Sequence, residues 1–191
     1  MCGGEGTRLD SDREKPMVRV GGTPMVERVV GALESSSVER VVAVVSPATP
    51  ETAATVECPT IETPGDGYVA DLNRALADDR IARPVVTVAA DLPLLDGDAV
   101  DAVLAAADGS CSVVVPVGRK RALGLSVDTQ FRYRGLAVTP AGVNVVDTDG
   151  DSVLLRRDPQ YAYNVNRRED LHAANWRVAG RTESNANVNQ E

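Results

Sequence analysis

Residues 85–93 have the sequence VVTVAADLP, in which an apolar run ends in an aspartate, a leucine and a proline. The run from Val85 to Ala90 has the length and β-branched content of a strand that is buried on both faces. Asp91 comes directly after it, at the sheet edge where α/β proteins bind their ligands. A carboxylate at that edge is well placed to hold Mg²⁺ against phosphate oxygens. The structural alternative is an aspartate that caps a helix or closes a turn.

Strand-like and helix-like segments alternate on both sides of this run, which predicts an α/β fold with a mostly parallel sheet. We expect further strands of the same kind over residues 38–46, 112–115 and 142–146. We expect helices that open at Thr23-Pro24 and Thr49-Pro50, and others over residues 68–77, 98–107 and 168–176. One domain is predicted over residues 1–179, and the polar stretch 180–191 is predicted to be disordered.

The composition is acidic, with 28 Asp and Glu against 20 Lys and Arg and a net charge of −8. An acidic surface with Lys15 and Lys120 as the only lysines resembles that of halophilic proteins. The negative charge disfavours nucleic acid as a partner, because phosphate backbones are bound through basic patches. We expect no membrane span and no secretory signal, and hence a cytoplasmic protein. The three scattered cysteines predict free thiols.

A glycine-rich stretch near the start is the strongest chemical motif. It consists of Gly3, Gly4, Glu5, Gly6, Thr7 and Arg8, followed by Glu14-Lys15-Pro16. Glycines let backbone N–H groups approach phosphates without obstruction by a Cβ. Arg8 and Lys15 can then neutralise a triphosphate. The motif is neither a P-loop nor a G-x-G-x-x-G fingerprint, so it predicts another type of nucleotide site, with a plain glycine turn as the alternative.

Such a loop normally follows a buried strand at the carboxyl edge of a sheet. Only two residues precede Gly3. We therefore expect the natural start to lie upstream, with Met1 at the end of a first strand.

Two further segments carry side chains suited to a nucleotide. Asn164 and Asn166 alternate along an extended stretch, so they share one face and could bind a metal ion or a phosphate, or simply form a turn. The loop Gly65-Asp66-Gly67-Tyr68 opens a helix and could lie against a base or a phosphate. His172, the sole histidine, is predicted to be solvated. The run Arg119-Lys120-Arg121 is predicted to be a solvated turn, with contact to an anionic acceptor as the alternative.

Together these segments resemble the nucleotidyltransferases related to the molybdenum-cofactor guanylyltransferases and the sugar-phosphate nucleotidylyltransferases. The glycine motif with Glu14-Lys15-Pro16 carries this resemblance. Gly67-Tyr68 with Asp71-Leu72-Asn73, and the stretch PAGVNVV at 140–146, are similar to the archaeal GTP:adenosylcobinamide-phosphate guanylyltransferases of cobalamin synthesis. Asn166 is followed by Arg167-Arg168, where the molybdenum-cofactor relatives usually carry Thr-Pro, which favours the cobinamide branch.

The resemblance implies a doubly wound α/β sheet that binds GTP at its carboxyl edge. It implies that the phosphates are held by Gly3, Gly4, Gly6, Thr7, Arg8 and Lys15. Ser46 and the loop residues Gly65, Gly67 and Tyr68 would lie on the base side. Gly142 would border the nucleotide, and Asn166 would lie beside the triphosphate. Arg8, Lys15 and Asp91 are the candidate catalytic residues, and Mg²⁺ near Asp91 is the expected cofactor.

The implied reaction transfers GMP from GTP to adenosylcobinamide phosphate and gives adenosylcobinamide-GDP and pyrophosphate. The expected partners are GTP and a phosphorylated corrinoid, and a homodimer is a candidate assembly. Two alternatives stay open: a nucleotidyltransferase for another acceptor, such as molybdopterin or a sugar phosphate, and a non-catalytic GTP-binding sensor.

Overall fold

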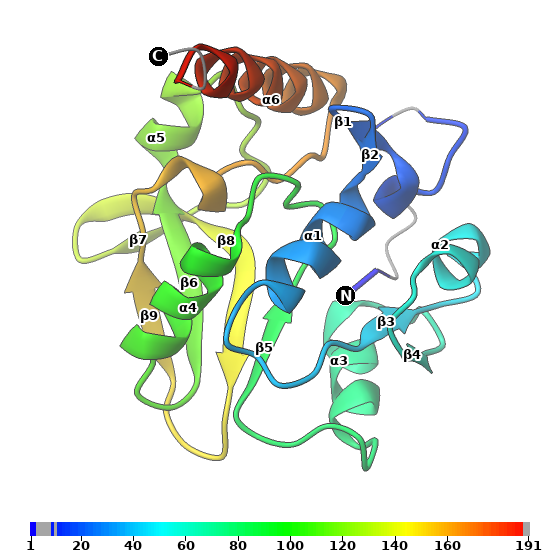
Figure 1. Ribbon diagram of the computed structural model, residues 1–191. Coiled ribbons are helices and arrows are strands. Elements are labelled where there is room, and N and C mark those ends of the chain that lie inside the picture. The colour runs from blue at the N-terminus through cyan, green and yellow to red at the C-terminus, as the bar shows by residue number, and fades with distance from the viewer. Residues whose placement is uncertain (3–8, 10, 189–191) are drawn as a thin grey trace.

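The computed structural model describes residues 1, 2, 9 and 11–188 of the chain. Its centre is a mixed sheet with the strand order β5-β8-β6-β9, in which β7 also pairs with β8. The strands are β5 (Val85–Val88), β6 (Cys111–Pro116), β7 (Phe131–Tyr133), β8 (Leu136–Val146) and β9 (Ser152–Leu155). A parallel pair, β3 (Ala43–Val45) and β4 (Thr60–Glu62), lies on the β5 side (Figure 1).

Residues 1 and 2 connect these two sets of strands. The amino group of Met1 donates to the carbonyl of Val88 at 2.9 Å, and the carbonyl of Met1 accepts from the N–H of Ala90 at 3.1 Å. The N–H of Cys2 donates to the carbonyl of Val44 at 2.8 Å. Residues 1 and 2 therefore join β3 and β5 into one hydrogen-bonded layer.

Strand β8 runs against its neighbours. It is antiparallel to both β5 and β6, and β9 is parallel to β6, so β5, β6 and β9 share one direction. The α/β fold is confirmed, but the expectation that residues 142–146 form a parallel strand was wrong. Val138 near the start of β8 pairs with Pro116 at the end of β6. The chain therefore enters β8 at the end of the sheet where it left β6, and no crossover connection is needed.

Helices cover both faces of the sheet, as a doubly wound fold requires. Val45 packs in one apolar cluster with Val26 of α1 (Met25–Glu34), whereas Val44 packs in another with Ala75 of α3 (Tyr68–Leu76). Successive residues of a strand point to opposite faces, so α1 and α3 lie on opposite sides of β3. α4 (Gly97–Ala106) packs beside α1 in front of the sheet (Figure 1).

Most helices begin where the sequence predicted. α2 (Pro50–Thr55) opens at Pro50, and α3 and α4 agree with their predicted spans to within one residue. The first helix is a correction, because Thr23 and Pro24 form β2 (Thr23–Pro24) and α1 starts at Met25. β2 pairs with β1 (Arg19–Val20) across Gly21-Gly22, whose φ angles of 58° and 83° suit a two-residue hairpin turn.

The last helix, α6 (Arg168–Val188), is longer than expected. It continues past Gly180 to Val188, while the predicted disorder of residues 180–191 stays a prediction. The three cysteines are free, as expected, with Cys2 and Cys111 buried. Within the described part of the chain, none of the helices combines the length and the apolarity that a bilayer crossing requires.

Candidate active site

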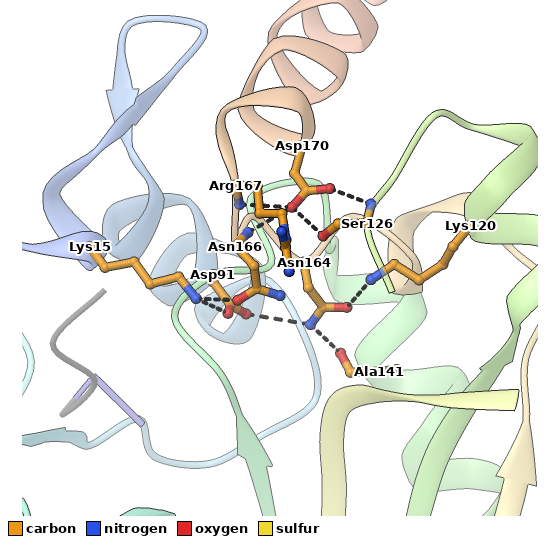
Figure 2. A network of polar contacts seen from close by, with 9 residues as sticks. All are labelled: Lys15, Asp91, Lys120, Ser126, Ala141, Asn164, Asn166, Arg167 and Asp170. Carbon is orange, nitrogen blue, oxygen red and sulfur yellow. Dashed lines mark hydrogen bonds and ion pairs between the residues drawn. The ribbon is translucent and has the colours of Figure 1, made fainter. Parts of the chain in front are cut away.

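A lysine bridges the segment after β5 and the segment before α6. Lys15 lies in the short 3₁₀ helix η2 (Lys15–Met17), and its Nζ donates to Asp91 Oδ2 at 2.5 Å and to Asn166 Oδ1 at 2.7 Å. Figure 2 shows the three side chains converging. The side chains of Lys15 and Asp91 are each 16% exposed, so a ligand can reach the ion pair. The structure thus brings together three of the residues predicted to bind the phosphates or the metal.

Asn164 lies on the buried side of Asp91. Its Nδ2 donates to the carbonyl of Ala141 at 2.9 Å and to Asp91 Oδ1 at 3.4 Å, and its Oδ1 accepts from Lys120 Nζ at 3.5 Å. Both oxygens of Asp91 therefore have a donor, one from Asn164 and one from Lys15. The carboxylate is held in a single orientation at the end of β5.

The carboxylate of Asp170 fixes the segment that carries Asn166. Asp170 is fully buried in the first turn of α6 and accepts hydrogen bonds from the N–H groups of Asn166 and Arg167 at 3.0 and 2.9 Å. It also accepts from the N–H and the hydroxyl of Ser126, both at 2.7 Å (Figure 2). Asp170 thereby joins the segment at Ser126 to the segment that carries Asn166. Sequence analysis gave Asp170 no role, although an acidic residue in a first helical turn is a known capping signal.

Glu14 connects the lysine segment to α2. Its Oε1 accepts from the N–H of Glu51 at 2.5 Å, and its Oε2 accepts from the N–H and the hydroxyl of Thr52 at 2.7 and 2.6 Å. These N–H groups belong to the first turn of α2 and have no partner within the helix. Glu14 therefore acts as a cap supplied from another segment, next in sequence to Lys15.

The residues predicted for the base side lie at the ends of β3 and β4. Gly65 has a φ of 82°, and a Cβ added to it would lie 3.3 Å from Ser46 Cβ. The N–H of Gly65 donates to the buried carboxylate of Asp71 at 3.0 Å. The half-exposed Tyr68 is anchored through its hydroxyl, which accepts from Asn144 Nδ2 at 2.9 Å. Ser46 and Gly65 are thus neighbours, while their contact with a base stays a prediction, as it does for Gly67 and Tyr68.

Gly142 lies against the buried asparagine. Its φ is 78°, and a Cβ at this position would lie 3.0 Å from Asn164 Nδ2 and 3.1 Å from Ala89 Cβ. Only glycine allows Asn164 to approach β8 this closely. Its predicted place beside the nucleotide remains a prediction. The predicted phosphate contacts Gly3, Gly4, Gly6, Thr7 and Arg8 lie outside the described residues.

The basic run at 119–121 differs from its prediction. It forms part of α5 (Val117–Ala122), in which Arg119 and Arg121 are exposed but Lys120 is only 3% exposed. The prediction of a solvated turn was therefore wrong for Lys120. The sequence signal for the burial of Lys120 is its spacing of three residues from the apolar Val117. Residues at this spacing share one helix face, and Val117 is also buried. His172 is exposed, as predicted.

Comparison with known proteins identifies the family of this chain. The family described as "MobA-like NTP transferase domain" matches residues 1–178. The chain belongs to this family. The transferase is 26% identical over 193 residues to the adenosylcobinamide-phosphate guanylyltransferase of Methanocaldococcus jannaschii, and the match covers 91% of this chain and 93% of that protein. The resemblance seen in the sequence is confirmed, and the transferase is an enzyme of the nucleotidyltransferase class.

Solved structures agree on the fold. The transferase matches a glucose-1-phosphate thymidylyltransferase from Bacillus anthracis with a TM-score of 0.62 and 12% identity, over 92% of each chain. It matches a CMP:2-keto-3-deoxy-manno-octonic acid synthetase in complex with CTP with a TM-score of 0.52 and 17% identity, over 73% of this chain and 70% of that one. A hypothetical transferase from Thermus thermophilus matches with a TM-score of 0.54 and 25% identity; the match covers 70% of this chain and little more than half, 56%, of that one.

The donor atoms of the transferase fit a magnesium ion that is shared with a nucleotide. Asp91 and Asn166 present hard oxygen atoms, and Mg²⁺ in nucleotide enzymes is commonly held by one or two protein oxygens together with phosphates and water. No cluster of three or more His, Cys, Asp or Glu that could enclose a metal occurs among the described residues. Asp91 and Asn166 are the residues that would hold such an ion.

Proposed function

We propose that this transferase moves GMP from GTP to a phosphorylated acceptor, with adenosylcobinamide phosphate as the first candidate. The observation that carries the proposal is the accessible cluster of Lys15, Asp91 and Asn166 at the carboxyl edge of the sheet. Lys15 follows the glycine motif in sequence. The cluster combines a cation that can bind phosphates with oxygen atoms that can bind a metal. The name and the 26% identity of the archaeal relative support the choice of guanylyl group and acceptor.

The proposed nucleotidyl transfer requires no general acid or base from the protein. A phosphate oxygen of the acceptor, already ionised at neutral pH, forms a bond to the α-phosphorus of GTP while the bond from that phosphorus to the β-phosphate bridging oxygen breaks. Pyrophosphate leaves with the electron pair, so no proton has to be removed by the protein. The demands are alignment of the reacting groups and neutralisation of charge. A site with one lysine and no histidine is adequate for them.

Lys15 is the residue that we expect to neutralise the triphosphate, together with Arg8. Mg²⁺, when bound, would supply further positive charge to the phosphate oxygens. Asp91 Oδ2 and Asn166 Oδ1 would hold the metal, and both now accept from Lys15. We therefore expect metal binding to compete with the Lys15–Asp91 ion pair and to release the ammonium towards the phosphates.

The test is pyrophosphate release with GTP, ATP, CTP or UTP in the presence of Mg²⁺ and adenosylcobinamide phosphate. Release with GTP at least tenfold faster than with the other nucleotides supports the proposal. Molybdopterin and sugar phosphates serve as competing acceptors in the same assay, and faster turnover with either one would reassign the acceptor. Tight GTP binding without pyrophosphate release from any acceptor would instead indicate a sensor.

A further inference from the structure

Lys120 is a buried cation for which the proposed chemistry has no use so far. It is 3% exposed, although Arg119 and Arg121 on the same short helix are exposed. Desolvation lowers the pKa of its ammonium, and the nearby carboxylates of Asp170, Asp91 and Asp128 oppose that shift. Burying a charged group is costly unless the group is paired, so this position requires an explanation beyond packing.

The hydrogen-bond partner of Lys120 is the amide of Asn164. Its Nζ lies 3.5 Å from Asn164 Oδ1, and on the other side Asn164 Nδ2 donates to the carbonyl of Ala141 at 2.9 Å. A lysine can only donate and a backbone carbonyl can only accept, so these two contacts fix which end of the amide faces which way. As Figure 2 shows, that orientation leaves Nδ2 directed at Asp91.

We propose that Lys120 is a positioning residue for nucleotidyl transfer, which acts through the amide of Asn164 on the carboxylate of Asp91. The inference rests on the proposed function. Without the ammonium of Lys120, Asn164 Oδ1 loses its donor and the carbonyl of Ala141 alone orients the amide. Asn164 Nδ2 is then held less firmly against Asp91 Oδ1, and the carboxylate less firmly in the orientation in which Oδ2 meets Lys15. Asn164 and Lys120 thus form the support of the catalytic carboxylate.

The test is a double-mutant cycle with Lys120→Met, Asn164→Ala and the double variant, measured as kcat and KM for GTP in pyrophosphate release. Each single change is expected to lower kcat by about tenfold, the scale of losing a residue that orients a metal ligand, with KM within about threefold of the original. If the two residues act as one unit, the double variant loses about tenfold and not about 100-fold. Arg40→Met, at an exposed position before β3, is the control and should retain full kcat.

Lys120→Gln separates orientation from folding, because its amide can still donate to Asn164 Oδ1 without a buried charge. We expect this variant to recover most of the kcat that Lys120→Met loses, and it carries the test if Lys120→Met does not fold. Unchanged kcat in Lys120→Met, or losses that multiply in the double variant, would overturn the inference.

The wild type, the two single variants and the double variant of the cycle are also titrated with GTP at several Mg²⁺ concentrations by calorimetry, which needs no acceptor. If wild type binds GTP but releases no pyrophosphate, the proposed function fails, and coupling of Lys120 and Asn164 in the Mg²⁺ concentration that GTP binding requires then decides the role of Lys120 separately. Absence of GTP binding by the wild type would contradict both the proposed function and the role inferred for Lys120.

Discussion

The ammonium of Lys15 lies 2.5 Å from a carboxylate oxygen of Asp91, 76 residues further along the chain. The pair forms where the 3₁₀ helix η2 meets the end of β5, and Asn166 completes it from the segment before α6. Three distant parts of the sequence therefore meet at one edge of the sheet. Because the pair is partly exposed, we expect a nucleotide and a metal to take the place of its present partners.

Replacing Lys15 with alanine is expected to lower the turnover number by about 10²-fold or more, the scale of losing a main electrostatic donor. Arg8→Ala is expected to act in the same way. The measurement is the initial rate of pyrophosphate release from GTP at saturating acceptor. Arg13→Ala is the control, since the side chain of Arg13 forms an exposed pair with Glu51 at 3.7 Å and such pairs contribute little. Near-normal turnover in both Lys15→Ala and Arg8→Ala contradicts the assignment.

Asp91→Asn tests the metal site. The variant keeps the shape of the side chain but loses the charge that would attract Mg²⁺, so the Mg²⁺ concentration for half-maximal turnover should rise about tenfold or more. Chelation of Mg²⁺ should abolish turnover of the unmodified transferase. A magnesium titration of the rate measures both effects, with Asp98→Asn, an exposed position on α4, as control. Identical magnesium curves for the two variants would exclude Asp91 as a ligand.

Asp170→Asn is expected to destabilise the fold and the site together. The carboxylate accepts four hydrogen bonds from buried or partly buried donors, and an amide in its place leaves at least one of them unsatisfied. The free energy of unfolding in urea should fall by about 3 kcal/mol. Ser126→Ala removes one of the four bonds and should cost about 1 kcal/mol. If both variants lost the same small amount, Asp170 would not be the centre of this network.

Glu14→Gln tests the cap on α2. Loss of the charge weakens the hydrogen bonds to the first turn of that helix, and the expected cost is about 1 kcal/mol, or a decrease of roughly 2–4 °C in Tm. The KM for GTP should rise as well, because the cap joins the lysine segment to the loop after β3. Glu57→Gln changes an exposed carboxylate that follows α2 and should leave both Tm and KM unchanged.

Local sequence signals predicted the parts of this molecule that depend on local chemistry. Thr49-Pro50 marks the start of a helix because proline suits the first helical position, and the apolar run before Asp91 marks a buried strand that ends at the ligand-binding edge. The place of Asp91 followed from the rule that such edges bind ligands. The places of Lys15 and Asn166 beside the phosphates were implied by the family resemblance.

Other features depend on tertiary structure and could not be predicted in the same way. The direction of β8 depends on which end of β6 the chain leaves and where it returns, and both strand directions have the same side-chain pattern. The spacing of Lys120 from Val117 could have indicated its burial, but its contact with Asn164 on another segment has no local signal. The capping of α2 by Glu14 spans 37 residues and has no local signature.

The contact of Glu14 with α2 has a consequence for redesigning this enzyme. The loop after β3 begins at Ser46 and leads into the helix that Glu14 caps, so it is tied to the segment that carries Lys15. If that loop contacts the base, as predicted, replacing it alone with the loop of a homologue that uses a different nucleobase is expected to displace Lys15 as well. We therefore expect a chimera with altered base preference to require exchange of both stretches together.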